Sequence, residues 1–262
     1  MSPSFSAPLD IKLMNATAWA LYGLFAFVTL GVVAVWAMQT SIFAIKKITV
    51  VGDITHTNAI TLRNYVVPRL RGGFVTLDLV RAREIFESVP WVRQAVVRRE
   101  FPNRLMVQLQ EHGAVAHWGA EGESRLLSDR GDVFEANTGE VEQEGLPRLN
   151  GPQGQGAQVL LAYQSLEPLF ADTDMALDQL ELTGRGSWLA WLDTGAVLQL
   201  GRGTPQEVFA RSQRFVNTLT QITSKYGRKP EALESADLRH EGGYAIRIRG
   251  VTTTELVQKQ KQ

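Results

Sequence analysis

The sequence predicts an α+β protein in three parts. A single N-terminal membrane helix precedes a small domain of the order strand, helix, helix, strand, strand, and a mostly antiparallel β domain with flanking helices follows. Residues 13–45 contain no Asp, Glu, Lys or Arg. Residues 92–111 alternate apolar and polar side chains with a period of two, as strands do. Residues 177–202 hold three short apolar runs separated by glycine-containing turns, the pattern of an antiparallel meander.

The composition excludes several classes of site. Lys plus Arg and Asp plus Glu number 27 each among 262 residues, so no global charge favours nucleic acid or an anionic surface. Cysteine is absent, which excludes disulfides, thiolate nucleophiles and cysteine-ligated zinc.

The first element is a membrane helix, expected over residues 16–40 after a short tail at residues 1–15, of which residues 1–12 are expected to be disordered. A membrane helix needs about 20 apolar residues. Trp19 and Trp36 lie near the two ends of this stretch, about 26 Å apart at helical rise, a spacing that fits two interfacial belts. A cleaved signal peptide would have a shorter apolar region and small residues at its cleavage site. We therefore expect a retained anchor.

The orientation of this anchor is less clear than its span. Only Lys12 and the amino terminus precede the helix, whereas Lys46 and Lys47 follow it, and this count weakly opposes a cytoplasmic N-terminus. Long domains translocate largely regardless of flanking charge. The expected topology keeps the tail cytoplasmic and the rest of the chain in the periplasm.

The small domain is expected over residues 45–112. It begins with a strand that ends at Gly52. The first helix has Thr57 or Asn58 as its N-cap, and Pro90 ends the second. Two helices of this length can cover one face of a three-stranded sheet.

The other two strands of this domain form a hairpin that turns at Pro102 and Asn103. Alternation assigns one set of side chains to the buried face and the other set to solvent. The expected buried set is Ala95, Val97, Phe101, Leu105, Val107 and Leu109. The expected exposed set is Arg98, Glu100, Met106, Gln108 and Gln110.

The β domain is expected over residues 113–250, with a disordered tail at 251–262. Residues 144–156 are predicted to form a loop, and a helix is expected from Gln158 to Phe170. A long helix is expected from Pro205 to Lys225, and a final hairpin turns across residues 241–243.

The sequence contains no recognisable set of catalytic residues, so we expect no enzymatic activity, no cofactor and no metal. Glu111, His112 and His117 are the best candidates for metal ligands, but on strands 112 and 117 fall on opposite faces. Asp172 and Asp174 lack the glycine and distal glutamate of a Ca²⁺ loop. The Gly-Arg-Gly at 201–203 lacks the rest of a phosphate-binding motif and reads as a turn.

The remaining candidate is the edge of the sheet at the final strand. A free edge presents unpaired N–H and C=O groups to which a partner strand can add. Tyr244, Ile246 and Ile248 share one face of that strand, and their pattern fits either docking or the core. Proline at Ala245 or Arg247 tests this edge. At the position whose N–H faces outward, proline should block partner binding, and at the other position it should break a hydrogen bond within the sheet and lower stability.

Several motifs along the chain carry a family resemblance. The most distinctive is VPWVRQAVVRREFPNRLMVQLQEHGAVAHW at residues 89–118. Four others are ITVVGDITHTNAITLRNYV, LLSDRGDVFE, LPRLNGPQG and VLQLGRG, and the last is ADLRHEGGYAIRI. Together they resemble the bacterial FtsQ/DivIB cell division family, over about residues 18–250. The resemblance implies a POTRA domain at 45–112, followed by the β domain.

The resemblance also implies a function and a site. Family members are non-enzymatic scaffolds of the division machinery in the inner membrane at the septum, and they link early and late division proteins. They bind FtsB, itself complexed with FtsL, by strand addition at the last β-strand; other division proteins are expected at the POTRA domain and the membrane helix. By position, the implied site residues are Arg185, Arg239, His240, Glu241, Gly242, Gly243, Tyr244, Ile246 and Ile248.

Two departures and two alternatives accompany this reading. The family carries Tyr where His240 stands and Trp where Ile248 stands, which shifts the expected anchor of the interface. One alternative is a POTRA-bearing component of an outer-membrane assembly or secretion system, but no barrel strands follow residue 112. The other is an anchored periplasmic enzyme, which would need a catalytic constellation.

Overall fold

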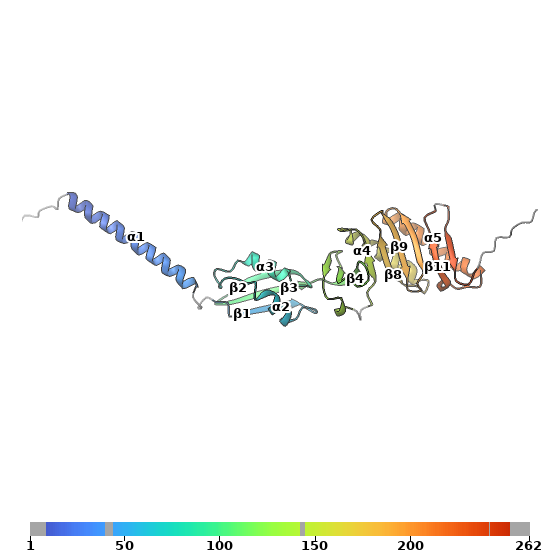
Figure 1. The fold of residues 1–262 in the computed structure, drawn as a ribbon, viewed down its shortest axis with the longest axis horizontal. Coiled ribbons are helices and arrows are strands. Elements are labelled where there is room, and N and C mark those ends of the chain that lie inside the picture. Colours follow the sequence, from blue (N-terminus) through green and yellow to red (C-terminus); the bar gives the residue numbers. More distant parts are fainter. Residues whose placement is uncertain (1–8, 40–43, 142–144, 241, 252–262) are drawn as a thin grey trace, which may run out of the picture. The chain divides into compact units, whose positions relative to one another are not determined.

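The computed structural model describes residues 9–39, 44–141, 145–240 and 242–251, and the predicted fold class is confirmed. The chain divides into two compact units, residues 1–111 and 112–262, each described here by itself. Figure 1 shows the order of elements: one long helix, a small α/β unit, and a larger sheet with two long helices.

The N-terminal helix α1 spans Leu9–Gln39. Within it Leu13–Val33 is long and apolar enough to cross a membrane, with a mean hydropathy of 1.8. The helix begins at Leu9, within residues 1–12, which were predicted to be disordered, so that prediction is wrong for residues 9–12. Because a helix satisfies its own backbone hydrogen bonds, extension beyond the apolar stretch costs little.

The part of the first unit that follows α1 is the region where the resemblance implies a POTRA domain, and it is called the POTRA unit below. It has a three-stranded sheet in the order β1-β3-β2, with β1 parallel and β2 antiparallel to the central strand. Asn58 caps α2 and Asp78 caps α3, since each side chain accepts a backbone N–H of the first turn. The elements are β1 (Lys47–Asp53), α2 (Ala59–Val66), α3 (Leu79–Glu87), β2 (Val92–Glu100) and β3 (Arg104–Glu111).

The inward face of the POTRA hairpin matches the predicted alternation except at one residue. Ala95, Leu105, Val107 and Leu109 are at most 2 % exposed. Phe101 was predicted to share this buried face, and that prediction is wrong: its side chain is 85 % exposed. Strand β2 ends at Glu100, so Phe101 lies in the turn, where the alternation of the strand no longer sets the direction of the side chain.

The second unit is built on a nine-stranded sheet in the order β12-β11-β10-β9-β8-β7-β4-β5-β6. Its first strands are β4 (Ala114–Trp118), β5 (Arg125–Ser128), β6 (Val133–Glu135) and β7 (Arg148–Asn150). The later strands are β8 (Leu177–Leu182), β9 (Ser187–Leu192), β10 (Val197–Arg202), β11 (Leu233–Asp237) and β12 (Ala245–Ile248). Short 3₁₀ turns occupy Thr138–Glu140 and Pro230–Ala232.

Helices α4 (Gly156–Ala171) and α5 (Pro205–Lys225) lie on one face of this sheet (Figure 1). A capping box between Thr204 and Glu207 starts α5. The core between helices and sheet includes Trp188, Phe170 and Phe215, all at most 1 % exposed. The sheet is mostly antiparallel, but β4 with β7, β7 with β8, and β10 with β11 pair in parallel.

Candidate partner-binding surface

Strand β12 forms one end of the nine-stranded sheet and pairs only with β11. Among the described residues no strand lies on its other side, so one row of its backbone groups is open. The chain reaches Val251 three residues after β12 ends. This open edge is the structural basis of the candidate site.

The direction of the open backbone groups follows from one hydrogen bond. The N–H of Arg249 donates to the carbonyl of Ala232 at 2.8 Å, so it points toward the neighbouring strand. Backbone direction alternates along a strand, which turns the N–H groups of Ala245 and Arg247 inward as well. The N–H groups of Ile246 and Ile248 therefore face the open edge. Proline at Ala245 or Arg247 cannot distinguish edge from ladder, because the two positions share one direction; Ile246 is the position that can.

The side chains of β12 divide between core and solvent. Ile248 is 5 % exposed and Ile246 packs against the main core. Tyr244, just before the strand, packs its ring edge-on against Phe215 at 5.1 Å, and its hydroxyl contacts Thr218 of α5. Ala245 and Arg247 are exposed. A partner strand at this edge would thus meet backbone groups first, with Ala245 and Arg247 beside it.

A basic groove adjoins the terminal hairpin. It has a volume of about 630 Å³ and lies between α5 and the terminal hairpin, at residues 238, 240 and 242–244. Arg211, Arg214 and Lys225 line it together with His240, and no described carboxylate does. Gly242 and Gly243 also line it, and a side chain at either would meet open space. The sequence prediction named the hairpin residues but missed the three cations of α5. Their spacings of three and eleven residues place them on the helix face over the hairpin.

The two arginines of the predicted site differ in their surroundings. Arg185 lies exposed in the turn between β8 and β9, and no hydrogen bond or ion pair is found for it among the described residues. Arg239 already has a partner within the chain: its guanidinium donates to both carboxylate oxygens of Asp237, at 2.8 and 2.6 Å. This hydrogen-bonded pair lowers the pKa of Asp237 to about 2. Glu241 lies outside the described residues.

The Gly-Arg-Gly at 201–203 forms a tight backbone turn at this end of the sheet. Gly201 has φ +82°, and a Cβ there would lie 3.0 Å from atoms of Arg211 and Arg239. Only glycine combines this backbone with the close approach of two arginines. The motif therefore acts as the turn that the sequence predicted, and it gathers basic side chains.

The residues considered as metal ligands are held in separate environments. Glu111 accepts the backbone N–H groups of three successive residues, Thr55, His56 and Thr57, at 2.6–3.0 Å. Burial raises the pKa of Glu111, but these hydrogen bonds outweigh it and hold the pKa below its ordinary value of 4.5. His112 stacks on Phe134 at 4.3 Å. No group of three metal-binding side chains occurs in the described part of the chain.

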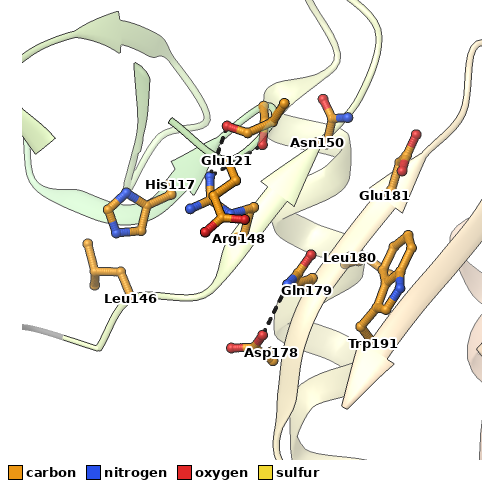
Figure 2. Close-up of a pocket in the computed structure, with 12 residues that line it drawn as sticks. His117, Glu121, Leu146, Arg148, Asn150, Asp178, Gln179, Leu180, Glu181 and Trp191 are labelled. Atoms are coloured by element: carbon orange, nitrogen blue, oxygen red, sulfur yellow. Dashed lines mark hydrogen bonds between the residues drawn. The ribbon is translucent and has the colours of Figure 1, made fainter. Parts of the chain in front are cut away.

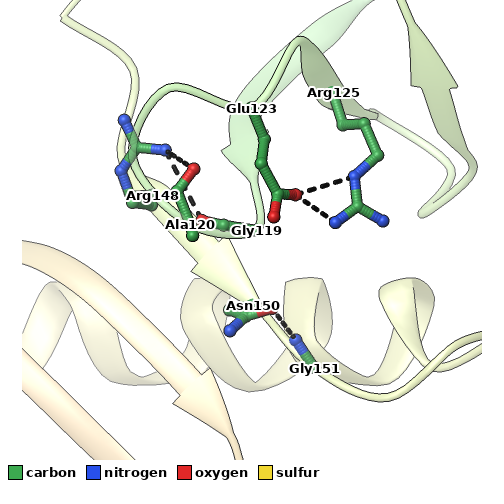
Figure 3. A network of polar contacts seen from close by, with 7 residues as sticks. All are labelled: Gly119, Ala120, Glu123, Arg125, Arg148, Asn150 and Gly151. Carbon is green, nitrogen blue, oxygen red and sulfur yellow. Dashed lines mark hydrogen bonds and ion pairs between the residues drawn. The ribbon is translucent and has the colours of Figure 1, made fainter.

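His117 lines a second hollow of about 500 Å³ on the open face of the sheet (Figure 2). Trp191 and Glu181 lie across this hollow from His117 in the figure. Arg148 donates to the carbonyls of Ala120 at 3.1 Å and Gly119 at 3.5 Å (Figure 3). Figure 3 also shows Glu123 paired with Arg125 in the same turn. These contacts hold the turn after β4 and account for Arg148, the arginine that lines the hollow.

Comparisons with known proteins match both units. The model "POTRA domain, FtsQ-type" matches residues 43–112. The model "Cell division protein FtsQ/DivIB, C-terminal" matches residues 116–239, and thus includes β11 but ends before β12.

Relatives match nearly the whole chain. Cell division protein FtsQ of Thiomonas arsenitoxydans is 37 % identical over 246 residues, 93 % of this chain and 89 % of the relative. The protein of the same name from Burkholderia pseudomallei is 37 % identical over 243 residues, 92 % and 94 % of the two chains. That from Neisseria meningitidis is 26 % identical over 213 residues, 81 % and 86 % of the two. By its order of parts, its two family matches and these relatives, the chain belongs to the FtsQ/DivIB family of bacterial cell division proteins.

Proposed function

We propose that this chain is a non-enzymatic scaffold of the division machinery that binds FtsB, in complex with FtsL, by strand addition at β12, and so links early and late division proteins. The observation that carries the proposal is the position of β12 at the end of the sheet with its outer backbone groups open. Main-chain hydrogen bonds to Ile246 and Ile248 provide affinity in this account, and neighbouring side chains provide selectivity.

Charge supports a partner segment rich in acidic residues. Arg185, Arg211, Arg214 and Arg239 lie near one end of β9, β10 and β11 or on the adjoining α5. Opposed charges across an interface speed encounter and exclude wrong partners more than they add affinity. Arg239 contributes less to partner binding than Arg185, because its guanidinium is already hydrogen-bonded to Asp237.

Copurification tests the proposal. The full chain, extracted in mild detergent from cells that express tagged FtsB and FtsL, should retain both, and the Ile246→Pro variant should lose both. Its matched control, Ile246→Ala, removes the same side chain and keeps the N–H, so it should retain them. Retention of FtsB by a folded Ile246→Pro variant would rule out strand addition at this edge.

The proposed topology places the N-terminus in the cytoplasm and residues 46–262 in the periplasm, at the division septum. The apolar helix, which is long enough to span a membrane, supports it, and Lys46 and Lys47 make a test worthwhile. A reporter that is active only after export, fused after Gln262, should be active. A stable but inactive fusion would contradict both the topology and the proposed function.

The proposed division into parts keeps the predicted bounds: tail 1–15, membrane helix 16–40, POTRA domain 45–112, β domain 113–250 and C-terminal tail 251–262. The compact units on either side of residue 111 support the boundary between the two periplasmic domains. Limited proteolysis tests it: the first cuts should fall outside 45–112 and 113–250, and an early cut within either range would contradict it.

A further inference from the structure

An exposed aromatic side chain lies at the turn between β2 and β3. Phe101 is 85 % exposed, and its ring rests edge-on against Phe74 at 5.2 Å. Phe74 itself is 2 % exposed. Arg99 donates to the carbonyls of Phe74 and Leu77, at 2.6 and 2.5 Å, and so fixes the loop behind the turn. Phe101 is thus supported from behind and presented to its surroundings.

The chain enters the POTRA unit beside this turn. The N–H of Lys46 donates to the carbonyl of Asn103 at 3.0 Å, and Lys47 lies opposite Arg104 in the register of β1 and β3. Val75, next to Phe74, is 44 % exposed. We call the group Lys46, Lys47, Val75, Phe101 and Arg104 the entry surface, because it surrounds the point where the chain arrives from the membrane helix.

The entry surface combines apolar and basic groups. Lys46, Lys47 and Arg104 are all exposed, and Glu100 is the acidic residue paired with Arg104 across the turn. Three positive charges against one negative charge leave a net charge of about +2 around Phe101. Aromatic rings are enriched at the level of lipid headgroups, and lysine and arginine bind anionic headgroups.

The length of the connection keeps this surface near the membrane. The apolar stretch ends at Val33 and α1 at Gln39. Residues 40–46 are seven in number, and a chain of that length spans at most about 25 Å. A short tether of this kind gives an effective concentration in the millimolar range, so even a weak surface affinity leads to docking.

We propose that the entry surface docks the POTRA unit on the anionic phospholipid surface of the membrane that α1 spans. Phe101 enters the headgroup region, and Lys46, Lys47 and Arg104 bind lipid phosphates. Docking fixes the height and tilt of the POTRA unit over the membrane, which a single covalent connection to α1 does not. The proposal holds for either orientation of the anchor and is separate from partner binding at β12.

A depth measurement on the full chain in lipid nanodiscs tests the proposal. The chain has no cysteine, so one introduced cysteine carries a fluorescent probe at a single site. Val75→Cys reports on the entry surface. Ile60→Cys is the matched control, because Ile60 is 72 % exposed and lies at the start of α2, near the opposite end of β1. In discs of phosphatidylglycerol and phosphatidylcholine with headgroup-labelled quencher lipid, the probe at 75 should be quenched strongly and the probe at 60 weakly.

Two substitutions then identify the groups that dock. Phe101→Ser should lower the docking constant about tenfold or more, because it removes a whole aromatic side chain from the interface. Lys47→Gln should lower it about fivefold at low salt. Both side chains are exposed, so the thermal unfolding of the POTRA unit should stay unchanged and a loss of quenching reports docking alone.

Three outcomes would overturn the proposal. They are equal quenching at positions 75 and 60, quenching that Phe101→Ser leaves unchanged, and equal quenching in discs of phosphatidylcholine alone. The discs contain no other protein, so an entry surface that serves a protein partner instead would show no quenching at position 75.

Discussion

The two edges of the nine-stranded sheet differ in charge and in the strand that forms them. Strand β12 is followed by Arg249 and preceded by Arg239, and Arg247 projects from it. Glu234 lies 3.6 Å from Arg247 and Asp237 pairs with Arg239, so Arg249 is the one of these three cations with no carboxylate partner among the described residues. Strand β6 has three residues, with Asp132 before it and Glu135 at its end. A charged residue in a short edge strand is a common device against unwanted pairing.

The comparison teaches that an open edge is not by itself a docking site. Both strands end the sheet, so both offer backbone groups. The charge beside each edge decides which segment approaches, and an acidic segment meets opposite charge at β12 and like charge at β6. The basic groove along α5 extends this preference beyond the strand itself.

The largest expected effect comes from proline at the two edges. Ile246→Pro should weaken FtsB binding by about 3 kcal/mol, a hundredfold or more, because it removes an outward N–H and adds a ring where the partner strand lies. Glu135→Pro at the β6 edge should leave binding unchanged. Titration of each purified variant with an FtsB–FtsL complex measures the difference. Equal losses from both variants would abolish the distinction between the edges.

Arg247→Pro gives the complementary result at the same edge. Its N–H points toward β11, so proline there should break the ladder and lower the free energy of unfolding of the second unit by about 3 kcal/mol. Chemical denaturation followed by tryptophan fluorescence measures this. A fully stable Arg247→Pro variant would show that the assignment of inward and outward groups is reversed.

The carboxylate of Glu111 gives an effect of about 2 kcal/mol in the POTRA unit, away from both edges. Glu111→Ala leaves three successive N–H groups without their acceptor. The folded-state pKa of Glu111 is lowered, so its stabilisation is present above the unfolded value near 4.5 and is lost as the pH falls through the folded value. The difference in stability between wild type and Glu111→Ala should therefore shrink below about pH 4.5. A difference that stays constant down to pH 2 would contradict this role, and FtsB binding at neutral pH should not change.

Substitution of single charged residues should change the free energy of FtsB binding by about 1 kcal/mol, or about fivefold in affinity. Arg185→Glu should weaken FtsB binding, and the loss should diminish at high salt because the residue is exposed. Arg239→Gln should have a smaller effect, since Asp237 already holds the guanidinium. Glu135→Arg at the opposite edge is the matched control. A larger loss from Arg239→Gln than from Arg185→Glu would show that the ion pair opens on binding.

The smallest effect is expected from the histidines near the β6 edge. Replacing His112 and His117 together by Gln should leave cell division intact, because neither residue contributes to β12. Complementation of a depletion strain, with protein abundance measured in parallel, tests this. Loss of division at normal abundance would favour a metal site or a catalytic role instead.

Most elements could be predicted from the sequence because their signals are local. The capping box at Thr204 and Glu207, and the length of the apolar stretch, are read directly from neighbouring residues. Strand β7 was predicted as a loop, since it has three residues and only Leu149 is buried. Parallel pairing of β10 with β11 depends on α5 crossing between them, and alternation along a strand carries no information about its neighbour.

The candidate site shows the same limit. The edge itself follows from the order of elements. The pairing of Arg239 with Asp237 could have been predicted from their spacing of two residues at the end of β11. The N–H groups of Ala245 and Arg247 point toward β11, and those of Ile246 and Ile248 point outward. This assignment could be made only once the pairing of β12 with β11 was known. To predict the exposure of Phe101, one must know where β2 ends, and the sequence pattern placed that end one residue too late.

Site-specific photocrosslinking in living cells tests the central claim most directly. A photoreactive amino acid at Ala245 or Arg247, both exposed, should crosslink FtsB during division. The same amino acid at Val133 or Glu135, on the opposite edge, should not. Crosslinks to FtsB from β6 with none from β12 would contradict strand addition at the last strand and transfer the partner site to the other end of the sheet.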